Sequence, residues 1–176
     1  SAPIVSFDAV PASQDYDKLY ASATSAYKKG KYSDAIDKFL SLIEKAPNDA
    51  GLRNDLAATY NKIAKYDMAI MQSREVITRI KDKKQFGAAY YNAGVAYEQK
   101  GNLQRALANY RLAVANGNKR AQSDVVRVTQ LARVKNVKNA RGKRFVFNSG
   151  TEKVKKSDIV KMRNVHDLAT HDDYVA

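Results

Sequence analysis

The sequence predicts an all-α fold of stacked helix–turn–helix pairs, from a repeated pattern, its period and the small residues inside it. The pattern Gly30–Ile36 returns in degraded form as Ala64–Ile70 and again as Gly101–Leu107. Its alanine recurs after 34 residues and then after 37, which is one period plus a three-residue insertion. A period of about 34 residues is typical of helical solenoids, which hold partners and perform no chemistry of their own.

Three units follow from this period, at about residues 16–49, 50–83 and 87–120. Each unit has small residues where its two helices must approach closely, with large side chains beside them to fill the gaps. The small residues of the first helices are Ala23, Ala57 and Gly94, those of the second helices are Ala35, Ala69 and Ala106, and the large ones include Phe39, Tyr60, Tyr97 and Tyr110.

The turns between helices have their own signals. Gly30 and Gly101 follow the first helix of their units, as a left-handed cap requires. Ala64 takes the place of this glycine in unit two, so we expect a different or strained turn there. Pro47 ends unit one. Unit two has no equivalent proline, and residues 79–85 contain the insertion, which predicts a longer helix or loop.

A capping helix is expected behind unit three, because a stack of helix pairs leaves an apolar face on its last pair. Residues 120–134 fit this role, since apolar side chains recur there at helical spacing. These side chains are Val125, Val128, Leu131 and Ala132.

Residues 135–176 differ from the repeats and are expected to be an irregular, extended tail. Phe145–Phe147 is a short strand-like run, and residues 151–154 are a possible return strand of a hairpin. Ser157 could begin a last short helix. An isolated hairpin is only marginally stable, so the tail would need to pack along the solenoid or on a neighbouring molecule.

The positions that define the units resemble the tetratricopeptide repeat family over about 105 of the 176 residues. The resemblance implies a right-handed α-solenoid of three units with a capping helix at residues 15–134. An N-terminal lead at 1–14 and a basic extension at 135–176 flank this domain. The resemblance also implies a scaffold or adaptor that binds a protein or peptide in its concave groove.

The groove positions of the family fall on the first helix of each unit. Tyrosines there offer apolar area with a hydrogen-bonding tip, and asparagine amides could grip a peptide backbone. Packing of these tyrosines between helices is the alternative interpretation. The groove residues that the resemblance implies are Tyr20, Thr24, Tyr27, Lys28, Asn54, Asn61, Lys62, Tyr91, Val95 and Glu98.

One branch of the family clamps the terminal carboxylate of chaperone tails with cationic residues. The corresponding positions here lack those cations, and Asp55 would repel a carboxylate. This disfavours a chaperone-tail adaptor. The positions are Tyr20, Thr24, Asp55, Ala88 and Asn92.

The positive charge of the chain is concentrated behind the repeats. The net charge is +13, and residues 116–165 hold 14 basic and 3 acidic side chains, a balance of +11. Such a stretch could contact the phosphates of nucleic acid or of anionic lipid, or it could dock on the groove of a second copy. A tail that contacts protein is the preferred interpretation. The cations concerned are Lys135, Lys138, Arg141, Lys143, Arg144, Lys153, Lys155 and Lys156.

Several functional classes find no support in the sequence. There is no cysteine, no Gly-x-Ser-x-Gly elbow and no phosphate-binding Gly-x-x-x-x-Gly-Lys string, so we expect neither an enzyme nor a cofactor. His166, Asp167, His171, Asp172 and Asp173 match no metal motif, and a solvated tail is preferred to a metal site. The absent cysteine, the missing initiator methionine and the lead at 1–11 favour a bacterial protein exported beyond the cytoplasm, although an expression scar or a trimmed boundary explains the start equally well.

Overall fold

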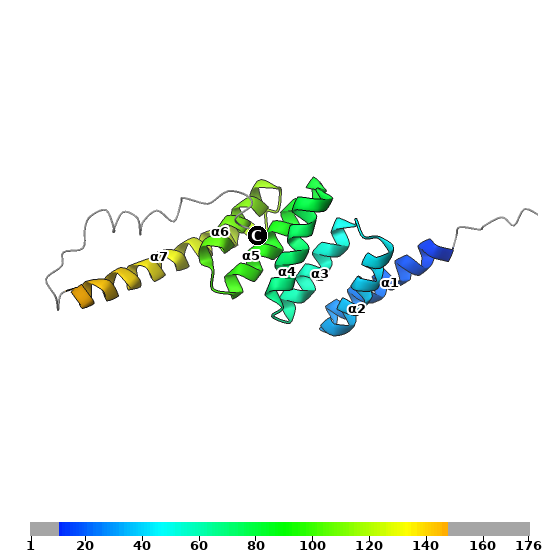
Figure 1. The fold of residues 1–176 in the computed structure, drawn as a ribbon, viewed down its shortest axis with the longest axis horizontal. Coiled ribbons are helices and arrows are strands. Elements are labelled where there is room, and N and C mark those ends of the chain that lie inside the picture. Colours follow the sequence, from blue (N-terminus) through cyan, green and yellow to red (C-terminus); the bar gives the residue numbers. More distant parts are fainter. Residues whose placement is uncertain (1–10, 148–176) are drawn as a thin grey trace, which may run out of the picture.

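The structure is a computed structural model that describes residues 11–147, and within this range it is an all-α solenoid without strands (Figure 1). A π-helical turn, Glu75–Ile80, continues the fourth helix, and a 3₁₀ turn, Lys83–Gln85, precedes the fifth. The seven α-helices are α1 (Pro11–Lys28), α2 (Tyr32–Lys45), α3 (Ala50–Lys62), α4 (Tyr66–Arg74), α5 (Phe86–Gln99), α6 (Leu103–Ala115) and α7 (Ala121–Phe147).

The helices form three successive pairs, α1 with α2, α3 with α4 and α5 with α6, and α7 then packs on α6. The predicted small positions are where the paired helices meet: Ala23, Ala35, Ala57, Ala69 and Ala106 are all fully buried. Gly94 shows why size matters there. A Cβ atom at this position would lie 2.7 Å from Cδ1 of Tyr110, a distance that real side chains essentially never adopt.

The three turns inside the pairs share one backbone conformation, although only two of them have glycine. Gly30 has a φ of 74° and Gly101 a φ of 81°, and Ala64 follows them with a φ of 60°. A left-handed φ brings the Cβ atom of alanine close to the following carbonyl oxygen, whereas glycine adopts it freely. The sequence leaves open a different turn or a strained one at Ala64, and the structure has the strained one.

We expect Ala64→Gly to stabilise the fold by about 1 kcal/mol, because it removes this strain. Ala21→Gly is the matched control: Ala21 is exposed in the middle of α1, where the same substitution should destabilise by about 1 kcal/mol. Urea unfolding of the two variants beside the parent protein measures both changes. Equal losses in both variants would contradict a strained turn at Ala64.

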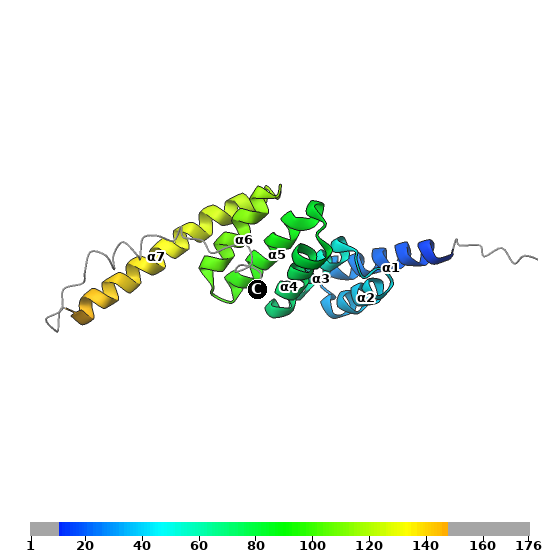
Figure 2. The ribbon, with the colours of Figure 1, turned by 45° about the horizontal axis from the view of Figure 1, so that its top comes forward.

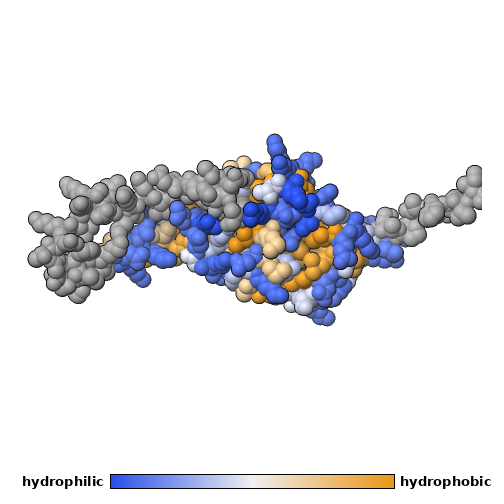
Figure 3. Space-filling view, in the orientation of Figure 1, coloured by the Kyte–Doolittle hydropathy of each residue, from blue (hydrophilic) through white to orange (hydrophobic). Residues whose placement is uncertain are grey.

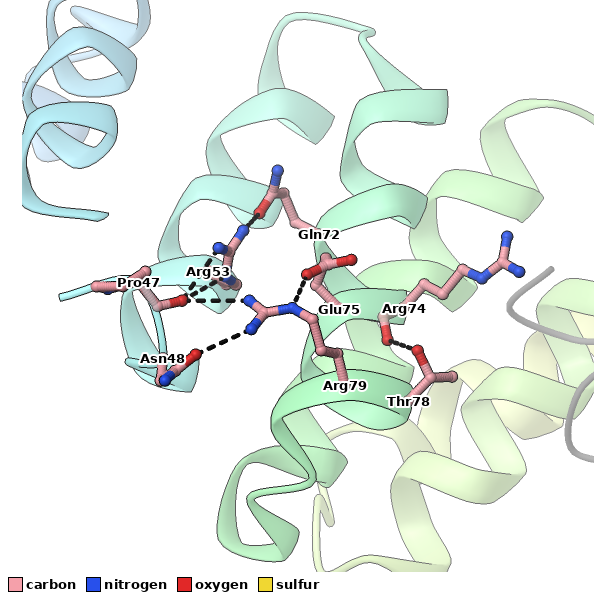
Figure 4. Close-up of polar contacts among 8 residues, drawn as sticks. All are labelled: Pro47, Asn48, Arg53, Gln72, Arg74, Glu75, Thr78 and Arg79. Atoms are coloured by element: carbon pink, nitrogen blue, oxygen red, sulfur yellow. Dashed lines mark hydrogen bonds and ion pairs between the residues drawn. The ribbon is translucent and has the colours of Figure 1, made fainter. Parts of the chain in front are cut away.

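The insertion between units two and three extends a helix, as the sequence predicts. The π-helical turn prolongs α4 and ends at Lys81, which is left-handed with a φ of 59°. This extra turn brings Arg79 back to the end of unit one, where its guanidinium donates to the Asn48 side chain at 2.9 Å and to the Pro47 carbonyl at 3.3 Å (Figure 4). Arg53 donates to the same carbonyl from α3, so two cations fasten the turn between the first two units.

The capping helix is present but longer than the sequence predicts. Ala121, Val128 and Ala132 are buried against the last pair, whereas Leu131, which was also expected on this face, is 45% exposed. The helix does not end at 134; it runs to Phe147, so the strand-like interpretation of Phe145–Phe147 is wrong. No proline interrupts this stretch, and its one glycine costs a helix only about 1 kcal/mol.

Figures 1 and 2 show α7 projecting well beyond the helix pairs at the end opposite α1. Of the N-terminal lead expected at 1–14, residues 11–14 already belong to α1, so the first helix begins earlier than the sequence predicts. Residues 1–10 lie outside the described residues, as do the expected return strand at 151–154, the short helix at Ser157 and the His/Asp cluster at 166–173. No helix between residues 11 and 147 combines the length and apolar character that crossing a bilayer requires.

Candidate partner-binding groove

A cavity of about 370 Å³ opens on the face that the first helices of the three pairs form together. Its lining comes from α1, from α3, from α5 and from the turn before α7, so it touches all three units. The lining residues are Tyr27, Asn54, Asp55, Ala58, Asn61, Lys62, Ala88, Tyr91, Asn92, Val95, Asn118 and Arg120.

Six of the ten predicted groove residues line this cavity: Tyr27, Asn54, Asn61, Lys62, Tyr91 and Val95. The other four lie outside its lining. Thr24 donates its hydroxyl to the Ala21 carbonyl of its own helix at 3.0 Å, and Lys28 is exposed at the end of α1. Tyr20 and Glu98 support residues of the groove wall instead.

The wall on the α5 side is built from two tilted tyrosine rings and a guanidinium group. The rings of Tyr91 and Tyr110 are 5.8 Å apart and tilted by 50°, and the guanidinium of Arg120 lies 5.4 Å from the centre of the Tyr91 ring. Burial raises the pKa of the Tyr91 hydroxyl, which therefore stays protonated. This arrangement presents a flat aromatic surface with a cation over it, a combination that stabilises both groups.

Glu98 anchors this wall to α7. It accepts a hydrogen bond from the Tyr110 hydroxyl at 2.7 Å and is ion-paired with Arg127. The hydrogen bond from Arg127 outweighs burial and lowers the pKa of Glu98, and burial together with Glu98 raises the pKa of Tyr110. The carboxylate of Glu98 is therefore occupied by partners within the protein.

On the α1 side, Tyr20 donates its hydroxyl to Asp55 at 2.9 Å. Burial and the neighbouring carboxylate of Asp55 raise the pKa of Tyr20 to about 12. Burial raises the pKa of Asp55 as well, and the hydrogen bond from Tyr20 compensates only in part. Asp55 lines the cavity and forms no ion pair among the described residues.

The asparagine amides of the groove are used within the fold. Asn54 donates to the carbonyl and to the side-chain oxygen of Gln85, each at 3.1 Å, and Asn61 donates to the Asn92 carbonyl at 3.0 Å. Asn92 donates back to the Asn54 carbonyl at 3.1 Å. These bonds fasten α3 to α5 and to the turn before it. The Asn54 nitrogen makes two of them and the Asn61 nitrogen one. That these side chains also grip a peptide backbone stays a prediction.

The basic residues expected in the tail are divided by the end of α7. Lys135 and Lys138 are exposed on the helix, and Arg141, Lys143 and Arg144 occupy positions on its last turns. Lys153, Lys155 and Lys156 lie outside the described residues. Figure 3 shows the visible surface of α7 as mainly hydrophilic, whereas apolar areas show between hydrophilic ones over the repeats.

Sequence reasoning missed four polar residues of the cavity as groove candidates. The sequence analysis considered Asp55 and Asn92 only as positions where a carboxylate clamp is missing. Each nevertheless adjoins a predicted groove residue on the same helix. Asn118 and Arg120 belong to the turn before α7, where repeat periodicity gives no signal. Asn118 is held over α5 by its bond to the Gly87 carbonyl at 3.2 Å.

We expect the stability of the fold to depend on the ionisation of Asp55. Because its pKa is raised in the folded chain, Asp55 holds a proton there that the unfolded chain releases, and its contribution to stability falls as the pH rises through that window. Asp55→Asn still offers an oxygen to Tyr20 but cannot ionise.

The Asp55→Asn variant should therefore be more stable than the parent protein at pH 7, and this advantage should shrink towards about pH 3.5, near the ordinary pKa of the side chain. Urea midpoints at both pH values measure it, with Asp17→Asn, an exposed change on α1, as control. An advantage that does not change with pH would contradict the burial of a charged Asp55.

Comparisons with known proteins agree with this architecture. Residues 20–73 and 79–121, more than half of the chain, match the tetratricopeptide repeat family, and the chain belongs to this family. The first TPR domain of human RPAP3, solved by NMR, is similar with a TM-score of 0.61 at 22% identity, over 69% of this chain and 95% of that one; the likeness shows the fold.

A probable UDP-N-acetylglucosamine–peptide N-acetylglucosaminyltransferase, SEC, of Arabidopsis thaliana is 31% identical over 104 residues. The match covers 57% of this chain and 10% of that protein, so the chain spans about a tenth of its relative's length. Tetratricopeptide repeats generally mediate contacts between proteins and are typically not catalytic.

Proposed function

We propose that this chain is a non-enzymatic adaptor that holds a peptide or protein segment in the cavity on its first-helix face. The observation that carries the proposal is the position of this cavity, since one hollow touches all three repeat units. A segment bound there would contact every unit at once, as on the extended binding surfaces that stacked repeats create.

The chemistry of the lining supports a peptide as the occupant. Tyr27 and Tyr91 are half-buried, and such rings bury a large apolar area at a small cost in side-chain entropy. Ala58 and Ala88 between them leave space for the side chains of a partner. The rim adds charges of both signs, which fix orientation more than affinity.

Tyr91→Ala tests the cavity, because it removes the aromatic surface and the support of Arg120. A photo-crosslinking amino acid at position 58 first traps and identifies the bound segment in the native source. We expect Tyr91→Ala to lower the affinity for that segment about tenfold in a binding titration. Leu40→Ala, an exposed apolar residue on α2, should leave binding unchanged. Crosslinks at position 40 that exceed those at 58 would move the binding surface elsewhere.

A second candidate function, contact with nucleic acid, follows from the length of α7. Between Val125 and Phe147 the helix has seven basic residues and no acidic one. Arg127 is ion-paired, but Arg133, Lys135 and Lys138 are exposed and form no ion pair within residues 14–140. An α-helix fits the major groove of DNA, where phosphates line both sides.

The distribution of these cations favours nucleic acid over a membrane. At about 100° per residue, the six basic positions from 133 to 144 are spread around the whole helix, with no gap wider than about 80°. A helix that lies on a bilayer needs a broad apolar face instead. Four apolar side chains of α7 are exposed, but the positions of Lys138 and Arg141 fall on the same side of the helix and interrupt an apolar face there. The four are Val126, Leu131, Val134 and Val137.

The α7 candidate predicts binding of a short DNA or RNA duplex that weakens steeply with salt. Neutralising Arg133, Lys135 and Lys138 to Gln should lower the affinity at low salt about tenfold and reduce the salt slope. The matched control neutralises Lys18, Lys29 and Lys45, three exposed lysines on the solenoid. Equal losses in both triple variants, or retention on anionic vesicles alone, would contradict the candidate.

Self-assembly through residues 135–176 stays a prediction.

A further inference from the structure

The charges around the cavity do not neutralise one another. Asp55 is the one carboxylate among the described residues of the lining, and Lys62 and Arg120 are the two cations. None of the three forms an ion pair within the described part of the chain. Tyr20 donates a hydrogen bond to Asp55, and Arg120 lies over the Tyr91 ring, but neither partner brings an opposite charge.

Asp55 is the least satisfied of these charges. Its carboxylate is partly buried, and burial raises its pKa despite the hydrogen bond from Tyr20. A carboxylate in such a place gains more from a nearby cation than an exposed one, because less water screens the pair. No described cation of the chain supplies this partner, so the surface is complementary to a basic group from outside.

The nearest cation of the lining along α3, Lys62, lies at a defined distance from Asp55 along the helix axis. Lys62 follows Asp55 by seven residues on α3, which places the two on the same face of the helix, about 10 Å apart along its axis. Ala58 lies between them in the lining and leaves the space above the helix open. An extended chain advances about 3.3 Å per residue and points successive side chains to opposite faces, so side chains on one face are about 6.6 Å apart at a spacing of two and about 13 Å apart at a spacing of four. These two spacings bracket the distance between Asp55 and Lys62.

We propose that the cavity selects extended segments in which a basic and an acidic side chain are two or four residues apart. The basic group pairs with Asp55 and the acidic group with Lys62, and Arg120 adds a second cation at the rim. This selectivity rests on the proposed function of the cavity and adds to it the chemical class of the partner. It also sets the direction of the bound chain, because the reverse order places like charges together.

The test uses fluorescein-labelled peptides of about ten residues with the full chain in anisotropy titrations. A neutral alanine–serine peptide receives one Lys and one Glu at spacings of one to six residues, in both orders. We expect one order at a spacing of two or four to bind roughly fivefold more tightly than the neutral peptide and the reversed order. Peptides with two Lys or two Glu should bind less tightly than this pair.

Two variants assign the charges. Asp55→Asn should remove the gain from Lys and keep the gain from Glu, and Lys62→Gln should do the opposite. Asp17→Asn and Lys45→Gln, exposed changes away from the cavity, should leave the preference intact. Because Asp55→Asn is expected to be more stable than the parent protein at neutral pH, a loss of selectivity in it would not reflect a damaged fold.

The outcomes distinguish a failure of the charge selectivity from a failure of peptide binding in the cavity. Three results would overturn the charge selection. These are equal binding of all peptides, tightest binding of a peptide with two Lys or two Glu, and an unchanged preference in Asp55→Asn. If Tyr91→Ala still lowered the affinity for those peptides, the cavity would remain the binding site. If no peptide bound and no crosslink formed at position 58, the proposed function itself would be wrong, and the selectivity with it.

Discussion

The contact between Gly94 and Tyr110 positions much of the rest of the structure. Only a residue without a side chain allows the Tyr110 ring to lie against α5, since a Cβ atom at 94 would overlap it. From that position Tyr110 supports the Tyr91 ring in the groove wall and donates to Glu98. Glu98 in turn holds Arg127 of α7. One close approach of two helices therefore sets both the groove wall and the root of the projecting helix.

The seam between α3 and α5 shows how the same helices serve stacking and recognition. Each amide donor of Asn54, Asn61 and Asn92 contacts the neighbouring unit, which fixes the two helices in register. Bonds to charged or polar groups in a largely buried seam are costly to break, because the freed groups stay away from water. The asparagines of these helices thus contribute to the stack, while the rings and charges of the lining are available to distinguish one partner from another.

The fold was largely predictable from the sequence, because repeat periodicity reports the positions where helices touch. The small residues, the glycine turns, the strained turn at Ala64 and the longer exit of unit two all have a local signal, and each prediction is confirmed. The end of α7 had no such signal. Phe145–Phe147 favours a strand by composition, but a preceding helix without a stop residue overrides that preference.

The candidate site was predictable only in part, for a related reason. Periodicity identifies the face of a first helix, and Asn61, Lys62, Tyr91 and Val95 lie where it indicates; whether they bind a partner stays a prediction. It does not show how a turn folds back, so Arg120 was missed. Nor does it show which polar groups meet across units, so the pairs of Tyr20 with Asp55 and of Asn61 with Asn92 were not foreseen.

Three polar side chains of α3 are incompletely satisfied. Asp55 is a partly buried carboxylate without a cation, and the side-chain oxygens of Asn54 and Asn61 are buried without a hydrogen-bond partner. Each costs stability, since a polar group removed from water needs a partner. A helix selected for stacking alone would replace such groups with apolar ones. Such groups also occur elsewhere, since the buried hydroxyl of Ser73 on α4 has no hydrogen-bond partner. On α3, however, they lie beside the cavity, as expected of a surface kept for binding a partner.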